Sequence, residues 1–307
     1  MKNLRSAKDL KPGRRCVCLA IGFFDGVHLG HQQIIRQTIA DARQHDALAV
    51  VVTFDRHPNS VVAPAHVPPL IYSLSQKLRT IAALGADALL LLRFNRRFSE
   101  ESGEAFVRKL VAGFGSVHSI CVGANFRFGH RRAGNVALLK QLGGELGFAV
   151  HGLAAVSLDG QAVSSTRIRR TIQAGQLDAA TQMLGRSSSL CGTVVRGDGL
   201  GRKLGFPTAN LAVAGLVLPP HGVYAVQATV HGRTRRGVLN IGVRPTLRRA
   251  KPQLRVEVHL LDFHGELYGE EMEVTFVEKL RGERRFPSLD ALRRQIAKDV
   301  ARVRRCL

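Results

Sequence analysis

The chain has 307 residues, 45% of them hydrophobic, and a formal net charge of +22. This length is sufficient for two domains of ordinary size. No apolar run approaches the ~20 residues of a membrane-spanning helix, and residues 1–13 are polar and basic without the apolar stretch of a signal peptide. The five cysteines are an odd number, so we expect a soluble protein with reduced thiols in the cytoplasm.

The positive charge is consistent with nucleic-acid binding, with anionic small substrates, or with a general bias toward arginine. Basic residues occur in short clusters along the chain, aromatic residues make up only 6%, and tryptophan is absent. Segments that bind nucleic-acid bases usually combine basic with aromatic side chains. A basic nucleic-acid-binding protein is therefore a remote alternative, because charge by itself gives salt-sensitive, non-specific affinity.

Up to about residue 185, apolar runs alternate with helical patterns. Strands are expected at 16–21, 49–54, 88–93, 119–122 and 149–153, with helices at 32–44, 76–84, 104–112 and 136–146. This alternation predicts an α/β domain, a doubly wound, Rossmann-like parallel sheet with helices on both faces. A ligand would bind beyond the carboxyl ends of the strands, where the loops after Ile21, Phe54 and Val122 converge.

The segment 24–31, Phe-Asp-Gly-Val-His-Leu-Gly-His, joins the first strand to the first helix. A glycine loop at a helix N-terminus is suited to phosphate oxygens, because the N–H groups there are unpaired and carry partial positive charge. His28 and His31 share one face of the first turn and could donate hydrogen bonds to a phosphoryl transition state. Two solvent-facing histidines are the alternative, which the order of strand, glycine and helix disfavours.

Two later loops could reach the same crevice. His57 precedes a proline at the end of the second strand, a position that is often structural. In the segment 123–129, Gly-Ala-Asn-Phe-Arg-Phe-Gly, Asn125 could bind a ribose or a base and Arg127 could neutralise phosphate. The two phenylalanines could cover a planar ring or fill the core.

A run of hydroxyl residues opens a further helix, which we expect to extend to about residue 175. Ser164, Ser165 and Thr166 stand at its start, and Arg169 follows one turn later. Serine or threonine at this position often only caps the helix. Three successive hydroxyls with an arginine could also bind one anionic group and close over a triphosphate.

From about residue 190 the pattern changes to short β-rich segments, at 191–196, 223–230, 236–241, 254–261 and 272–277, followed by a helix at 289–303. These segments predict a small antiparallel β-barrel with a terminal helix. Glycine, arginine and serine at 185–189 interrupt both patterns. We therefore expect one domain at 1–185 and a second at 186–307.

The segment 197–210, Gly-Asp-Gly-Leu-Gly-Arg-Lys-Leu-Gly-Phe-Pro-Thr-Ala-Asn, is the most informative part of the second half. Its glycines can bend a backbone around phosphates, and Thr208 and Asn210 offer hard oxygen ligands for Mg²⁺. A glycine-rich hairpin is the alternative. Glu257 alternates with apolar neighbours, so its carboxylate should point away from the barrel interior.

Together these motifs resemble the bacterial bifunctional riboflavin kinase/FAD synthetases in order and spacing. The segments 24–31, 123–129 and 164–169 resemble the FMN adenylyltransferase module, and 197–210, 222–224, 240–246 and 256–262 resemble the riboflavin kinase module. The resemblance implies that ATP phosphorylates riboflavin to FMN and then adenylylates FMN to FAD with release of pyrophosphate. Because Ala162 replaces a basic residue often found there, a riboflavin kinase with a weakened adenylyltransferase domain is the alternative.

The resemblance also implies a set of site residues. Catalytic roles fall to His28, His31 and Glu257. ATP or phosphate contacts are expected at Gly22, Phe24, Asp25, Gly26, Gly30, Ser164, Ser165, Thr166, Arg169, Gly201, Arg202, Gly205 and Pro207. Flavin contacts are expected at His57, Asn125, Arg127, Tyr224, Arg281 and Phe286, and Mg²⁺ ligands at Thr208 and Asn210. The implied partners are riboflavin, FMN and ATP, with neither a membrane nor nucleic acid, and no oligomer is indicated.

Overall fold

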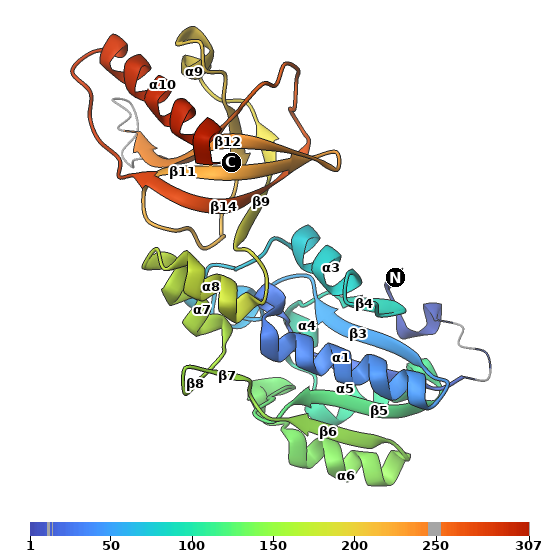
Figure 1. The fold of residues 1–307 in the computed structure, drawn as a ribbon. Helices are drawn as coiled ribbons and strands as arrows, with labels where there is room; N and C mark the ends of the chain where they lie inside the picture. Colours follow the sequence, from blue (N-terminus) through green and yellow to red (C-terminus); the bar gives the residue numbers. More distant parts are fainter. Residues whose placement is uncertain (11–12, 14, 245–252, 307) are drawn as a thin grey trace. The chain divides into compact units, whose positions relative to one another are not determined.

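The computed structural model describes residues 1–10, 13, 15–244 and 253–306. The chain divides into two compact units, Met1–Ile168 and Arg169–Leu307 (Figure 1). This division lies inside helix α7 (Ser165–Gln173), upstream of the boundary expected between residues 185 and 186, which stays a prediction. Among the described residues, no helix is both long and apolar enough to cross a membrane.

The first unit is built on a parallel sheet. Its strands are β1 (Lys2–Leu4), β2 (Val17–Ile21), β3 (Leu48–Phe54), β4 (Ala88–Leu92), β5 (Val117–Gly123) and β6 (Ala149–Leu153), with a small hairpin of β7 (Ser157–Leu158) and β8 (Gln161–Ala162). Its helices are α1 (Leu29–Gln44), α2 (Asn59–Val62), α3 (Leu74–Ala82), α4 (Arg96–Ser99), α5 (Gly103–Phe114) and α6 (Val136–Leu146).

The strand order of this sheet determines where a ligand can bind. Within the described residues the order is β1-β4-β3-β2-β5-β6, and every neighbouring pair is parallel. The chain places β3 and β4 on one side of β2 and then β5 and β6 on the other. In open α/β sheets ligands bind beyond the carboxyl ends of the strands at such a change of direction, here between β2 and β5.

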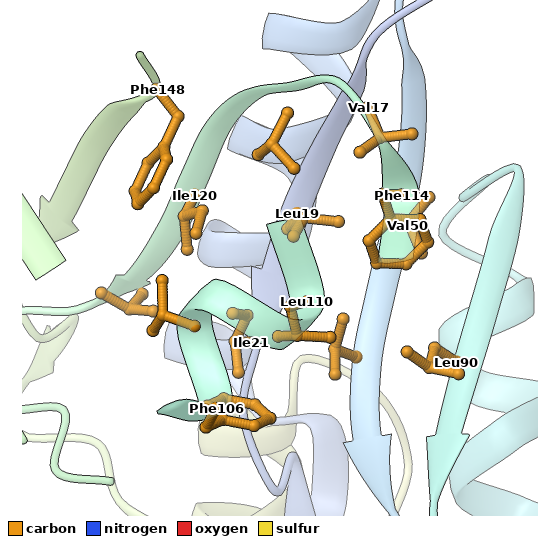
Figure 2. Close-up of a cluster of buried hydrophobic side chains, with 14 of the residues drawn as sticks. Val17, Leu19, Ile21, Val50, Leu90, Phe106, Leu110, Phe114, Ile120 and Phe148 are labelled. Atoms are coloured by element: carbon orange, nitrogen blue, oxygen red, sulfur yellow. The ribbon is translucent and has the colours of Figure 1, made fainter. Parts of the chain in front are cut away.

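Both faces of this sheet are covered, which explains why its strands are continuous apolar runs. On one face, Phe106, Leu110 and Phe114 of α5 pack against Leu19 and other strand residues (Figure 2). On the other face, the cluster around Ile35 of α1 also includes residues of α3. The predicted fold class of this half is therefore confirmed.

The second unit contains an antiparallel barrel. Its strands are β9 (Ser189–Val195), β10 (Ala209–Ala212), β11 (Gly222–Val230), β12 (Arg233–Arg244), β13 (Gln253–Leu260) and β14 (Glu271–Arg281). The described residues form a closed barrel in the order β10-β13-β12-β11-β14-β9, with β9 also paired to β10. Helices α8 (Leu177–Leu184), α9 (Leu200–Lys203) and α10 (Leu289–Cys306) accompany it.

The two sides of the barrel wall have different partners. Val256, Val258 and other alternate residues fill the interior. On the outer side, Val223 and Val238 pack against Val303 of α10, which lies along the barrel in Figure 1. The predicted barrel with a terminal helix is confirmed.

Candidate functional site

The loop between β2 and α1 adopts an unusual backbone conformation. Phe24, Gly26 and Val27 have φ angles of 54°, 74° and 40°, and His28 is the N-cap of α1. A β-branched residue at positive φ is strained and persists only where its surroundings hold it in place. The contacts that hold this loop in its strained conformation therefore determine the geometry of the candidate site.

Several polar groups hold this loop. The Asp25 carboxylate accepts backbone hydrogen bonds from Ile71 at 3.0 Å and from Tyr72 at 3.3 Å. The side-chain amide of Gln32 donates to the carbonyl of Val27 at 3.0 Å. Asp25 is only 2% exposed, so its carboxylate holds the loop, and its predicted contact with ATP or phosphate stays a prediction.

The predicted histidine pair is brought together at the start of α1. The rings of His28 and His31 stack with centroids 3.6 Å apart and planes inclined by 22°. The rings of Phe24 and His31 are nearly perpendicular, with their centroids 5.3 Å apart. Phe24 itself is buried in the core. Since His28 is the N-cap, both imidazoles lie where the helix N–H groups begin.

The two glycines of the loop differ in what they allow. A Cβ at Gly26 would lie 2.9 Å from Ile71, whereas one at Gly30 would touch the His28 ring at an ordinary 3.4 Å. Gly22 precedes the loop, and its N–H donates to Val52 of β3 at 3.1 Å. This hydrogen bond extends the pairing of β2 with β3, and the contact of Gly22 with phosphate stays a prediction.

The strand order places two further predicted loops at the same edge, because β3 and β5 flank β2. The His57 ring lies 5.0 Å from Phe23 and accepts the backbone N–H of Asn59 at Nδ1, so its ring proton is on Nε2. Asn125 and Arg127 are exposed.

The phenylalanines of the loop after β5 belong to the core. Phe128 is 8% exposed, and Phe126 stacks on it at 5.2 Å. Of the two interpretations left open by the sequence, the structure therefore supports core residues. Phe128 is buried in this core, whereas Phe126 is partly exposed at its margin.

The hydroxyl run at the start of α7 contacts the loop after β2. Ser165 Oγ donates to the carbonyl of Asp25 at 3.0 Å. Ser164 Oγ accepts the backbone N–H of Arg167 at 3.2 Å, as an N-capping serine does. Thr166 is exposed, and Arg169 is the first residue of the second unit.

The second unit has a cavity of about 910 Å³ outside the barrel wall. This volume is in the range of sites for small molecules and cofactors. It is lined by residues of the glycine-rich segment, of β12 and β13, and of the connection between β14 and α10. Five predicted site residues are among them: Gly201, Thr208, Glu257, Arg281 and Phe286.

Glu257 occupies the centre of a row of polar residues across three strands. It is the register partner of Asn210 in β10 and of Asn240 in β12, so all three side chains share one side of the wall. Because Val256 and Val258 point inward, this side is the outer one, as the alternation predicted. The guanidinium of Arg255 lies 3.9 Å from Glu257 and 3.0 Å from Asp198.

The glycine-rich segment folds closely over the predicted metal ligands. A Cβ at Gly201 would lie 3.0 Å from Thr208 Oγ1, and one at Gly197 would overlap the side-chain amide of Asn210. Glycine at these positions lets the backbone approach the two oxygen donors. The close approach of the glycine-rich backbone thus brings a potential phosphate loop next to a potential Mg²⁺ site.

Three other residues predicted to contact ATP or phosphate, Arg202, Gly205 and Pro207, lie outside the set that lines the cavity. Arg202 is exposed in α9, and Gly205 has a φ of 85°, where glycine is favoured. The carbonyl of Pro207 lies 2.9 Å from Nδ1 of His259, a lining residue.

The predicted flavin contacts of this unit have different positions. Tyr224 is 1% exposed within the barrel core, and its hydroxyl donates to the carbonyl of Pro220, so a flavin contact there stays a prediction. Burial raises the pKa of this phenol to about 12. Arg281 lines the cavity, forms a bidentate pair with Asp299 of α10, and lies 5.7 Å from the ring of Phe286.

Sequence motifs do not single out several residues that the structure places at these sites. Arg255 and Asn240 line the cavity. The side chain of Gln32 donates to the carbonyl of Val27, and that of Lys77 donates to the carbonyl of Phe23, both in the loop after β2. The position of Lys77 could have been noticed in the sequence. It lies three residues after Leu74 and four before Ile81, which places it on the apolar face of its helix. The predicted segment 240–246 extends past residue 244 and so lies partly outside the described residues.

Comparisons with known proteins match both halves of the chain. A family model described as FAD synthetase matches residues 11–167, and one described as riboflavin kinase matches residues 184–307. A bifunctional riboflavin kinase/FMN adenylyltransferase of Pseudomonas fluorescens is 40% identical over 99% of this chain and 97% of its own length. The enzyme of the same description from Escherichia coli K12 is 39% identical, over 97% and 96%.

A solved structure from Streptococcus pneumoniae, described as a macrolide-efflux protein, also resembles the chain. The two are 28% identical with a TM-score of 0.81, and the match covers 98% of each chain. The match thus extends over both the sheet unit and the barrel unit.

The fold and the two sites define an ATP-dependent transferase with a nucleotidyltransferase unit and a kinase unit. The chain belongs to the family of bifunctional riboflavin kinase/FMN adenylyltransferases. Its reactions are the phosphorylation of riboflavin to FMN and the adenylylation of FMN to FAD, each with ATP.

Proposed function

We propose that the barrel unit forms FMN in the cavity around Glu257 and that the sheet unit forms FAD at the His28–His31 loop. The observation that carries the first assignment is the convergence of Gly201, Thr208 and Glu257 on one cavity. The stacked histidines at the N-terminus of α1 support the second.

In the kinase reaction, Glu257 acts as the general base. Its carboxylate takes the proton of the riboflavin 5′-hydroxyl, the hydroxyl oxygen attacks the γ-phosphorus of ATP, and ADP leaves. The guanidinium of Arg255 lies 3.9 Å from this carboxylate. Arg255 also connects Glu257 to Asp198 at the start of the glycine-rich segment.

Thr208 and Asn210 are the proposed ligands of Mg²⁺. Both offer hard oxygen atoms, and both lie under glycines whose missing side chains leave the backbone close to them. Bound Mg²⁺ would neutralise the charge of the ATP phosphates. Thr208 and Asn210 would position these phosphates beside Glu257, together with Arg202 and the backbone at Gly205 and Pro207.

In the adenylyl transfer, the phosphate of FMN attacks the α-phosphorus of ATP and pyrophosphate leaves. His28 and His31 donate hydrogen bonds to the developing phosphate charge, with the N–H groups of α1 beside them. No covalent nucleophile is required, since alignment and charge neutralisation carry this reaction.

The remaining predicted residues supply positioning. His57 can donate through Nε2–H, and Asn125 and Arg127 are exposed for contact with FMN. Gly26 and Gly30 shape the phosphate loop. Ser164 caps α7 and Ser165 fastens it to the loop after β2, while the exposed Thr166 hydroxyl, with Arg169 one turn further along the helix, supplies donors to ATP. The buried ring of Phe24 and the hydrogen bond from Gly22 to Val52 hold the phosphate loop against the sheet.

Product analysis of two full-length variants tests the division. Glu257→Gln should lower the rate of FMN formation by about 10²–10⁴-fold, because the base is lost, and should still convert added FMN to FAD. His28→Ala should show the opposite pattern, with FAD formation reduced by about 10²-fold and FMN formation retained. Loss of FAD formation in Glu257→Gln would contradict the assignment, and an unaltered chain that makes FMN but no FAD would support the kinase-only alternative.

A further inference from the structure

Lys77, a residue of α3, is buried at the carboxyl ends of two strands. It is 4% exposed, although lysine is seldom buried without partners. Its ammonium group donates to the carbonyl of Phe54 at 2.8 Å, the carbonyl of Phe23 at 3.2 Å and Oγ1 of Thr53 at 3.3 Å. An ammonium has three N–H donors, and three oxygens receive them.

These oxygens come from the ends of two different strands. Phe23 follows β2, whereas Thr53 and Phe54 end β3. The Thr53 hydroxyl also donates to the Phe23 carbonyl at 3.1 Å, so the two strand ends form one hydrogen-bonded unit. Lys77 therefore fixes the starting points of both loops that leave this edge of the sheet.

Each loop carries a proposed site residue a short distance beyond the lysine contact. Phe23 immediately precedes Phe24, the first left-handed residue of the strained turn that leads to His28. The Phe23 ring lies 4.5 Å from the ammonium and 5.0 Å from the ring of His57. The lysine is thus linked to both sides of the FMN adenylyltransferase site.

We propose that Lys77 is a positioning residue for adenylyl transfer, which holds the His28–His31 loop and the His57 loop in register through Phe23, Thr53 and Phe54. The inference rests on the assignment of FAD formation to this site. A shift of about 1 Å in a catalytic group can cost ~10²-fold in rate, so loss of this anchor should act mainly on kcat.

The charge on Lys77 provides a separate readout. Burial lowers the pKa of its ammonium to about 8, partly offset by the carboxylates that face it, Asp25 after β2 and Asp55 after β3. Below this pH the group carries all three hydrogens. Above it, one donor and the charge are lost, so FAD formation should decline as the pH rises through about 8.

The test compares Lys77→Met with Lys109→Met in the full-length chain, where Lys109 is an exposed lysine of α5. Steady-state FAD formation from FMN and ATP is measured from pH 6.5 to 9.5, with riboflavin phosphorylation by the same preparation as the internal control. Lys77→Met should lower kcat for FAD formation by ~10–100-fold, change KM less than threefold and lack the decline near pH 8. FMN formation should be unchanged, and Lys109→Met should match the unaltered chain in both reactions.

Three results would overturn the proposal: FAD formation by Lys77→Met within twofold of the unaltered chain, an unchanged pH profile, or a rise in KM with constant kcat. If Lys77→Met does not fold, Thr53→Val decides, because it removes one acceptor and keeps the side-chain shape. It should lower kcat for FAD formation at least threefold, and an unchanged kcat would reject the proposal. Absence of FAD formation by the unaltered chain would instead contradict the proposed function of the site itself.

Discussion

At the scale of single residues, the same side-chain type serves different purposes according to its surroundings. Asp25 is a buried acceptor of backbone hydrogen bonds, whereas Glu257 faces a cavity beside an arginine. A carboxylate saturated by amide donors holds a loop, and one at a cavity wall can exchange a proton. The motif containing each residue was visible in the sequence, but its neighbours were not.

The buried position of Tyr224 gives a prediction at this scale. Tyr224→Phe should lower the free energy of unfolding by about 1 kcal/mol, because the hydrogen bond to the Pro220 carbonyl is lost from a buried position. Since the ring lies in the barrel core, KM for riboflavin should stay the same. Urea unfolding measures the stability and steady-state kinetics measure KM. A several-fold rise in KM would show that Tyr224 contacts the flavin.

At the scale of elements, the cavity depends on the attachment of α10 to the barrel. Arg281 at the end of β14 pairs with Asp299 of α10 through two contacts at 3.0 and 2.9 Å. Arg281 and Asp299 both line the cavity. The arginine that the sequence suggested as a flavin contact therefore also fastens one wall of the site.

Asp299→Asn should weaken this attachment. We expect a loss of stability on the order of 2 kcal/mol, less than the ~3–5 kcal/mol for breaking a fully buried pair, because part of the Arg281 side chain reaches water. KM for riboflavin should rise, while FAD formation from added FMN should not change. Thermal unfolding and kinetics test this, with Lys298→Gln on the exposed side of α10 as the control. Equal behaviour of the two variants would contradict the expected role of the pair.

At the scale of the whole chain, the two compact units do not coincide with the boundary expected near residue 185. Two contacts connect α8 to the barrel: Leu177 packs against the barrel core, and Thr181 Oγ1 accepts the backbone N–H of Ser188. Helix α8 also lies within the second compact unit. Glycine and serine at 185–189 mark a turn within that unit as well as the end of the α/β pattern.

Two shortened chains test this placement. A piece that begins at Arg169 should be more stable than one that begins at Ser187 by about 1–2 kcal/mol, because it keeps the buried part of Leu177 and the Ser188 hydrogen bond. Both should form FMN from riboflavin and neither should form FAD. Denaturant unfolding and product analysis measure these outcomes, and equal stability would favour the boundary at 185.

The sequence patterns did not predict β1, β10 or the two-residue strands β7 and β8, and β1 and β10 show why such elements escape detection. β1 has three residues, and only Leu4 is buried. β10 has four residues and follows a proline and threonine in a glycine-rich segment. Segments this short lack a full period of hydrophobic alternation, and the ladder to neighbouring strands stabilises them.

The sequence by itself determined the two fold classes, most element positions and the motifs of both sites. These are local properties, since strand and helix periodicity, glycine loops and hydroxyl runs are written in neighbouring residues. The His28–His31 loop and the alternation around Glu257 were already visible at that level.

Only the tertiary structure decided which groups meet. The strand order of the sheet brings the His28 and His57 loops to one edge, and the barrel register sets Asn210 and Asn240 on either side of Glu257. Lys77 and Tyr224 owe their roles to burial among residues distant in the sequence. A contact between distant residues depends on how strands pair and helices pack, which no local pattern specifies.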